Sequence, residues 1–226
     1  VGPHFDEIES EIAALSGLRE KPAGTVRITT VEHAADTILW PKLAPVMLEY
    51  PDINIEIISE YGLKDIVAER YDAGVRLGEQ VDMDMISLPL ARDFRFAVVG
   101  APSYFMGKTF PGTPRDLNDH SCIRLRLPTH GGFYTWEFRK DETEIKVRID
   151  GRATFSTINM MSQAALDGLG LAYLPLDTVE NYLENGMLVQ VLTDWCPPRP
   201  PYHLYYPSRL QHSPAFALVL EALRIP

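Results

Sequence analysis

The chain has 226 residues, with 21 lysines and arginines against 31 aspartates and glutamates, and a net charge of -10. Its apolar fraction of 46% is typical of a globular protein with a real core, and its length allows one large domain or two small ones. A chain this acidic is a poor candidate for holding a phosphate backbone, because that needs clustered lysine and arginine. The apolar runs are too short to span a membrane, and the polar, acidic N-terminal segment shows no signal peptide.

Metal, disulfide and catalytic motifs are absent from the sequence. Cys122 and Cys196 lie far apart, outside any framework pattern, which favours two reduced thiols in a cytoplasmic protein. The six histidines are scattered singly, without metal-ligand spacing. There is no Gly-x-Ser-x-Gly, no His-Glu-x-x-His, no phosphate loop and no Cys-x-x-Cys. We therefore expect no metal, no cofactor and no enzymatic activity.

The segment 5–18 predicts a helix. Phe5, Ile8, Ile12 and Leu15 follow the three-four-three spacing of a coiled-coil seam. The stripe also fits an ordinary amphipathic helix. Because glycines and a proline follow it, we interpret it as the end of a linker helix that pairs with a partner.

A strand, a helix and a second strand are predicted next, at 25–30, 34–49 and 53–58. The helix has apolar residues at helical spacing and ends before Pro51, because the residue before a proline is pushed out of the α region. In such a βαβ unit, the end of the first strand and the start of the helix form a crevice where small ligands usually bind. The unit therefore indicates ligand sensing.

Strands and helices alternate through the rest of the chain, which predicts an α/β fold. The chain enters a second half near 98–101 and leaves it near 200–204, so two crossing strands would form a hinge beside a cleft. Further strands are predicted at 71–78, 86–90, 94–100, 122–125, 134–139, 144–149, 171–175, 188–192 and 202–207. Further helices are predicted at 63–69, 157–169, 178–185 and 214–223.

An ordered set of short motifs runs through residues 24–224. It comprises Gly24-Thr25-Val26-Arg27-Ile28, Leu39-Trp40-Pro41-Lys42-Leu43, Tyr50-Pro51-Asp52-Ile53, the segment 72–78, Ala101-Pro102-Ser103-Tyr104, the glycine-containing segment 164–175, and the segments 188–192 and 206–209. Taken in this order, the motifs resemble the effector-binding domain of LysR-type transcriptional regulators.

The resemblance implies a two-lobed α/β fold like that of type 2 periplasmic binding proteins. Lobe I would comprise 24–99 and 203–226, and lobe II would comprise 100–202, with 1–23 as linker helix and connector. A winged helix-turn-helix domain, missing from this chain, would make the DNA contact. The resemblance also implies homodimers or homotetramers, in which helix 34–49 of one subunit packs near helix 157–169 of another.

Candidate effector-binding residues begin at the first strand-to-helix turn, with Thr30, Glu32 and His33. Backbone N–H groups and the helix dipole favour an anion there, whereas Glu32 suits an amine or hydroxyl. The alternative is that Thr30 and Glu32 only cap the helix and that His33 is structural. The other candidates are Tyr61 and Gly62 after the second strand, Ser103 and Tyr104 at the start of lobe II, and Thr157, Ile158 and Asn159 at the start of its main helix.

Arginines and aromatic residues offer further candidates. Arg76 could clamp a carboxylate, but a salt bridge with Asp72 is its expected use. Arg124 and Arg126 alternate on one strand and so share a face. Four residues follow closely that could form an aromatic wall with them or serve the core, as is expected of the tryptophan: His130, Phe133, Tyr134 and Trp136.

We expect an effector-sensing domain in which a small molecule, a carboxylate or another polar metabolite, binds between two lobes and modulates transcription. One alternative is an extracytoplasmic solute-binding protein of a transport system. The other is an enzyme on the same fold, which the lack of a catalytic cluster disfavours.

Overall fold

The structure, a computed structural model, describes residues 22–62, 65–78, 85–90, 93–128, 132–208 and 213–224. It divides into two compact units. Unit 1 is built from the chain up to Arg92 and from Pro201 onward, and unit 2 is the continuous segment Asp93–Pro200. The predicted linker helix at 5–18 lies outside the described residues. None of the described helices is long and apolar enough to cross a membrane.

A five-stranded mixed sheet forms the centre of unit 1, in the order β2-β1-β3-β12-β4. Strand β1 runs parallel to both its neighbours, whereas β12 is antiparallel to both of its own. The β1–β2 register pairs Gly24 with Ile53 and Thr30 with Ser59, which confirms the predicted βαβ unit. The strands are β1 (Gly24–Thr30), β2 (Ile53–Ser59), β3 (Ala73–Leu77), β4 (Met85–Pro89) and β12 (Tyr202–Pro207).

The first helix differs from its prediction at its start. It begins at Glu32 rather than at residue 34, and it runs through α2 (Glu32–Ala34), a π-helical turn η1 (Ala35–Leu39) and α3 (Trp40–Glu49). The π turn ends two residues before Pro41, whose ring has no N–H and would clash with the carbonyl of residue i−4. A widened turn lets the helix pass this proline, and such bulges are frequent at functional sites.

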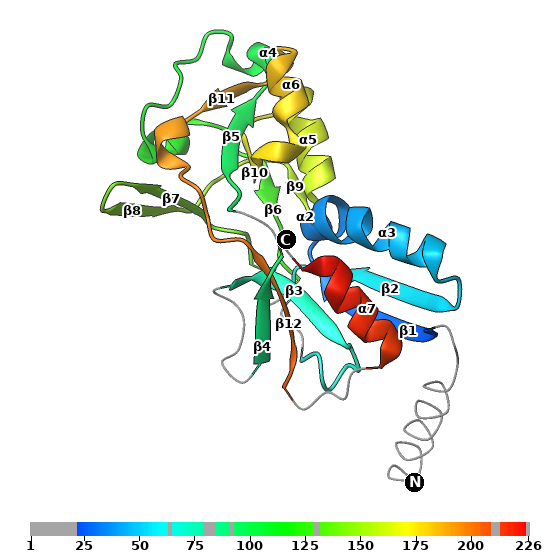
Figure 1. Ribbon diagram of the computed structural model, residues 1–226. Helices are drawn as coiled ribbons and strands as arrows, with labels where there is room; N and C mark the ends of the chain where they lie inside the picture. The colour runs from blue at the N-terminus through cyan, green and yellow to red at the C-terminus, as the bar shows by residue number, and fades with distance from the viewer. Residues whose placement is uncertain are drawn as a thin grey trace. The chain divides into compact units, whose positions relative to one another are not determined.

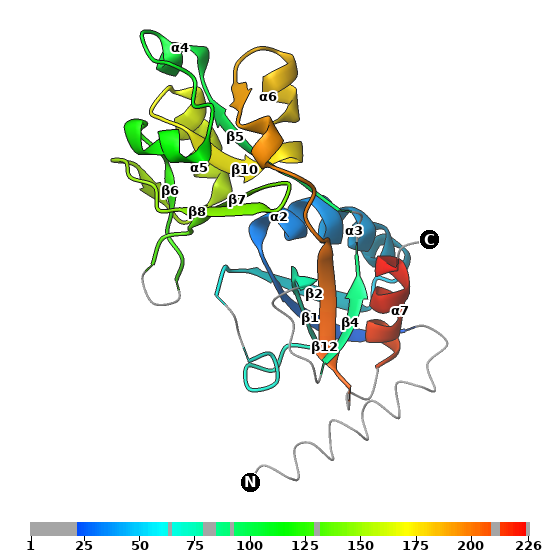
Figure 2. The same cartoon turned by 90° about the vertical axis from the view of Figure 1, so that its left-hand side faces the viewer.

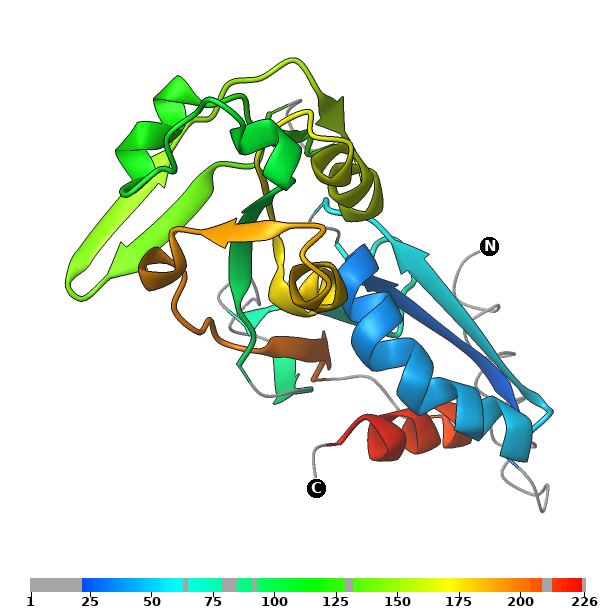
Figure 3. The same cartoon turned by 90° about the horizontal axis from the view of Figure 1, so that it is seen from above.

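Helices α3 and α7 (Pro214–Leu223) pack together beside the sheet, in blue and red in Figures 1 and 3. Ser213 caps α7 by accepting a hydrogen bond from the N–H of Phe216 at 3.1 Å, as a serine at this position is expected to do. Leu39, Leu43 and Phe216 are buried, so the apolar stripes of these helices form part of the core of unit 1.

Lys42 links α3 to the end of α7. Its ammonium donates to the carbonyl oxygens of Leu90 at 3.3 Å, Leu223 at 3.1 Å and Arg224 at 3.5 Å. A cation there satisfies carbonyls that a helix end leaves free and opposes the helix dipole.

The Lys42→Met substitution should lower the free energy of unfolding by about 1–2 kcal/mol, because it keeps the apolar stem and removes the charged donor. Urea denaturation measures the change. Lys140→Met is the matched control, since it breaks an exposed 3.0 Å ion pair with Asp194, which should contribute at most about 0.5 kcal/mol. Equal losses in the two variants would contradict the helix-capping role of Lys42.

The helix predicted at 63–69 is wrong over its described part. Residues 66–70 form turns instead. The Asp65 carboxylate accepts hydrogen bonds from the N–H groups of Val67 at 3.1 Å and Ala68 at 3.0 Å. An aspartate that bonds to backbone two and three residues onward competes with a regular helix, and here it sets a local turn.

The described residues of unit 2 form three small sheets. Strands β10, β5 and β11 form an antiparallel sheet, β7 and β8 form an antiparallel hairpin as predicted, and β6 pairs with β9 in parallel. The strands are β5 (Phe96–Gly100), β6 (Arg124–Leu125), β7 (Trp136–Lys140), β8 (Thr143–Val147), β9 (Thr154–Phe155), β10 (Ala172–Pro175) and β11 (Val189–Val191). Strand β9 was not predicted from the sequence.

The helices of unit 2 are short. Thr157 is the N-cap of α5 and accepts from the N–H of Met160 at 3.4 Å, as predicted. The helix predicted at 178–185 is split into a 3₁₀ turn and an α-helix, and it ends before Gly186, which has a φ of 70°. The helical segments are α4 (Pro102–Phe105), η3 (Pro114–Asp119), α5 (Ile158–Leu166), η5 (Leu176–Thr178), α6 (Glu180–Glu184) and η6 (Thr193–Trp195).

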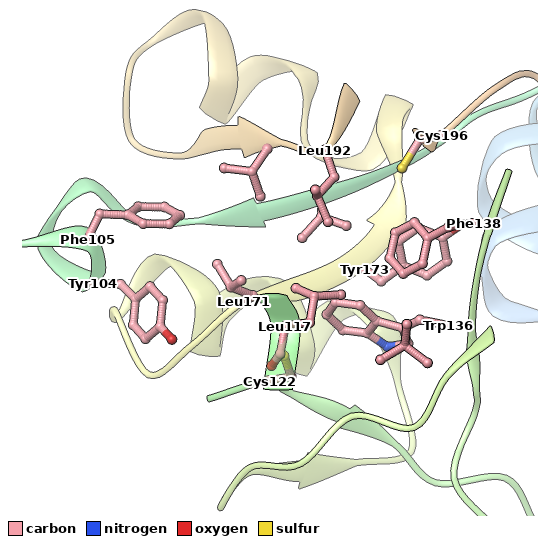
Figure 4. Close-up of a cluster of buried hydrophobic side chains, with 13 residues drawn as sticks. Tyr104, Phe105, Leu117, Cys122, Trp136, Phe138, Leu171, Tyr173, Leu192 and Cys196 are labelled. Atoms are coloured by element: carbon pink, nitrogen blue, oxygen red, sulfur yellow. The ribbon is translucent and has the colours of Figure 1, made fainter. Parts of the chain in front are cut away.

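The core of unit 2 is aromatic (Figure 4). Trp136 is completely buried, as predicted, and its ring centroid lies 5.3 Å from that of Tyr173. Cys122 and Cys196 are both buried here and both free. Burial raises the pKa of each thiol to about 12, so neither is a reactive thiolate at neutral pH.

The chain joins the units through two segments. Phe94 and Arg199 form an antiparallel bridge in unit 2, with N–H to O distances of 3.2 Å and 2.8 Å. In unit 1 the N–H of Leu90 donates to the carbonyl of Tyr202 at 2.9 Å. Figure 2 shows β4 and β12 side by side in the sheet.

Candidate functional site

The parallel strands of unit 1 bring polar residues together at their carboxyl ends. The N–H of Glu60 donates to the carbonyl of Thr30 at 2.8 Å, which joins the end of β1 to the residue after β2. The Thr29 hydroxyl lies 3.5 Å from a Glu60 carboxylate oxygen. This edge of an α/β sheet is where ligands usually bind.

Arg76 lies at the centre of this edge, on β3. Its guanidinium is 1% exposed and donates to the Thr29 hydroxyl at 3.2 Å, the Gly62 carbonyl at 2.9 Å and the Val75 carbonyl at 2.8 Å. Burial lowers the pKa of Arg76. The expected salt bridge with Asp72 is not formed, because the Asp72 carboxylate accepts from the backbone N–H of Arg27 at 2.7 Å. Arg76 instead joins its own strand, β3, to the end of β1 and to the segment after β2 through these hydrogen bonds.

The other candidates of unit 1 divide into buried and accessible residues. Thr30 and His33 are buried, and His33 Nδ1 lies 3.2 Å from the Tyr202 hydroxyl. Glu32 and Tyr61 are half-buried, with 3.5 Å between the Tyr61 hydroxyl and a Glu32 carboxylate oxygen. The N-cap is Val31, without a side-chain hydrogen bond, so neither Thr30 nor Glu32 caps the helix. Gly62, the fifth candidate of unit 1, is also buried, so Glu32 and Tyr61 are the two that offer side chains to a ligand.

In unit 2 the predicted residues lie at two ends of α5. Thr157, Ile158 and Asn159 begin the helix, and Asn159 is exposed. Ser103 lies beside Gly168, just beyond the far end of the helix, where an added Cβ would come within 2.8 Å of the serine oxygen. The structure thus separates Ser103 from Asn159 by the length of α5.

Tyr104 is a core residue. It is 6% exposed, and its hydroxyl lies 3.2 Å from His120 Nδ1 and accepts from the N–H of Ser121 at 2.9 Å. Burial raises the pKa of this phenol. Tyr104 therefore packs in the core of unit 2 and does not offer its side chain to an accessible surface.

Arg124 and Arg126, which were predicted to share a face, both lie over the ring of Phe133. The guanidinium carbons of Arg124 and Arg126 lie 4.4 Å and 4.7 Å from the ring centroid of Phe133. His130, which was grouped with them, lies outside the described residues. Within the described chain, no group of three or more His, Cys, Asp or Glu side chains could hold a metal ion.

Comparison with known proteins gives consistent matches. The family model described as "LysR substrate binding domain" matches residues 19–225. A Pseudomonas aeruginosa relative is 51% identical over 99% of this chain and 73% of its own length. The HTH-type transcriptional regulator PgrR of Escherichia coli is 44% identical over 99% of this chain and 75% of its own.

The full-length structure of the Vibrio cholerae virulence activator AphB, a member of the LTTR protein family, has a similar fold. Its TM-score is 0.79 at 23% identity, with 98% of this chain and 74% of that chain covered. The fold is thus the periplasmic-binding-protein-like type 2 fold predicted from the sequence. Of the three functions considered from the sequence, a regulator, a transport protein and an enzyme, the family match supports the regulator. The chain therefore belongs to the LysR family of transcriptional regulators, a non-enzymatic family, and forms its small-molecule effector-binding domain.

Proposed function

We propose that unit 1 binds a polar metabolite at the carboxyl ends of its parallel strands, through Glu32 and Tyr61. The observation that carries this proposal is the half-buried pair formed by these two side chains above a buried, rigid layer. A carboxylate in such a place accepts hydrogen bonds from the hydroxyl or amino groups of a small molecule. Thr30 and His33 hold the turn, and Gly62 contributes its carbonyl to Arg76.

Arg76 supports the site without contacting the ligand. Its hydrogen bonds to Thr29 and Gly62 join the end of β1 to the segment that carries Tyr61. Side chains held by such buried contacts lose little freedom on binding, so more of the interaction energy is available for affinity. The geometry therefore favours a preformed site for a small ligand.

The test is a thermal-shift screen of polar metabolites with the purified chain, because a ligand that binds the folded state raises its stability. Titration calorimetry then compares each hit with the Glu32→Gln and Tyr61→Phe variants. Loss of a charge-assisted hydrogen bond should weaken binding about 10-fold or more in Glu32→Gln. Glu221→Gln is the control, since Glu221 is an exposed carboxylate at the end of α7.

The control should bind like the wild-type chain. A metabolite that shifts the melting temperature yet binds both site variants with wild-type affinity would contradict this placement. Asn159→Ala tests the predicted contribution of α5 to ligand binding. Asn159 is exposed, so its replacement should leave the stability of the fold unchanged.

We further propose that the chain works as a homodimer or homotetramer in the cytoplasm, and that a helix-turn-helix domain of the kind named in its relatives makes the DNA contact. Large apolar side chains support an assembly through α3 and α5: Trp40 is 56% exposed, Leu48 87% and Met160 50%. An effector would act by binding two arrangements of the subunits with different affinity.

A further inference from the structure

Unit 2 contains a pocket that plays no part in the proposed function above. Its volume is about 470 Å³, within the range that small-molecule sites occupy. Side chains from β6, from the segment before β7 and from the segment after β8 form its wall, which includes Arg124, Phe133, Thr135, Arg148, Ile149 and Asp150.

Arg124 is held firmly at one side of the pocket. Its Nε donates to the Thr154 hydroxyl at 3.2 Å, its Nη1 lies 3.4 Å from an Asp150 carboxylate oxygen, and its guanidinium stacks on Phe133 at 4.4 Å. Its second amino group, Nη2, makes no hydrogen bond with the described residues. This free edge is a preorganised donor for an anion.

Arg148 adds a second cation. Its side chain is exposed and forms no ion pair within the described parts of the chain. The one acid on the wall, Asp150, is 98% exposed at its side chain and also accepts from the N–H of Gly151 at 2.7 Å. Two arginines against one aspartate leave the pocket with a net positive charge, in a chain whose net charge is -10.

Apart from Thr135 and Gly132, the rest of the wall is apolar. Phe133 is 39% exposed, and its side chain lines the pocket. Arg126 also lies over this ring, at 4.7 Å, so the ring is held in place from the strand. Ile149 and the Phe133 ring together suit a flat apolar body beside the two guanidinium groups.

Solvated surface arginines are the simpler interpretation of such a cluster. That interpretation does not explain why a fixed guanidinium, a partly exposed aromatic ring and a cavity occur together at this place. We propose that this pocket binds a small aromatic carboxylate, with its carboxylate between Arg124 and Arg148 and its ring against Phe133 and Ile149.

The experiment uses benzoate as the probe, with calorimetry or ligand-observed NMR on the whole chain. Benzoate should bind more tightly than benzamide, which lacks the charge, and more tightly than acetate, which lacks the ring. The Arg148→Gln substitution should weaken benzoate binding about 10-fold. Phe133→Ala should weaken it by a similar factor, and its melting temperature shows whether it remains folded.

Two controls distinguish binding in the pocket from binding at the unit 1 site and from nonspecific attraction of the anion to surface arginines. Arg152→Gln removes an exposed arginine that is outside the pocket wall, and it should bind benzoate like the wild-type chain. Glu32→Gln alters the site proposed in unit 1 and should also leave benzoate binding unchanged. The proposal is overturned if benzoate does not bind at millimolar concentration, if Arg148→Gln binds it normally, or if either control weakens binding as much as Arg148→Gln.

Discussion

The Gly151→Ala substitution should lower the free energy of unfolding by about 3 kcal/mol or more. A Cβ at this position would lie 2.0 Å from the carbonyl oxygen of Cys122 and 2.9 Å from its carbonyl carbon and amide nitrogen. These are backbone atoms of the adjacent segment, where the N–H of Cys122 donates to the carbonyl of Asp150 at 2.8 Å. The clash can be relieved only by moving two chain segments apart, and overpacking of this kind is strongly destabilising.

Urea denaturation followed by circular dichroism measures this effect. Gly112→Ala is the matched control, because its added Cβ would lie 3.8 Å from the nearest atom, an Asp116 carboxylate oxygen. Its stability should remain within about 0.5 kcal/mol of wild type. A Gly151→Ala variant as stable as Gly112→Ala would show that the two segments are not in contact. Since Asp150 adjoins Gly151, a destabilised Gly151→Ala variant should also lose benzoate affinity.

The Trp136→Ala substitution should cost about 3–5 kcal/mol of unfolding free energy. Trp136 is completely buried in the core of unit 2, among Phe138, Tyr173 and Leu117, and truncation of a buried aromatic residue to alanine leaves a large cavity. The indole N–H has no hydrogen-bond acceptor among the described residues. An unpaired buried donor is unfavourable, so part of the tryptophan's contribution to packing is offset.

Trp136→Phe distinguishes packing from hydrogen bonding. It keeps an aromatic ring and removes the unpaired donor, so we expect it to cost roughly 1 kcal/mol, far less than Trp136→Ala. Chemical denaturation followed by circular dichroism compares the two. If Trp136→Phe is as destabilising as Trp136→Ala, then the indole N–H makes a hydrogen bond that stabilises the core.

The elements that the sequence predicts well are those with a strong local signal. Strands β1 and β2 alternate or follow glycine, and the helix between them has apolar residues at regular spacing, so their order and type follow from pattern. The Thr157 cap is likewise local, because a threonine before an apolar run needs only its own backbone neighbours. Local patterns predict single elements, and the resemblance to the family predicts the overall fold into which they assemble.

The candidate site is harder to predict because its contacts join distant segments. Arg76 is four residues from Asp72, and local spacing favours a salt bridge, but the fold presents Thr29 and Gly62 to it instead. The distance between Ser103 and Asn159 depends on which end of α5 meets α4, which no local pattern determines. The π turn before Pro41 and the turn set by Asp65 show that single residues can override a correct periodicity.

The sheet order of unit 1 has a consequence for synthesis on the ribosome. Among the described strands, β4 pairs with β12 alone, and β12 follows the whole of unit 2 in the sequence. A nascent chain must therefore expose the edge of β3 and the unpaired β4 until β12 emerges, whereas unit 2 is continuous and completes earlier. Exposed strand edges promote pairing between chains. Unit 1 is thus the part of the molecule that is open to misassembly until β12 has been synthesised.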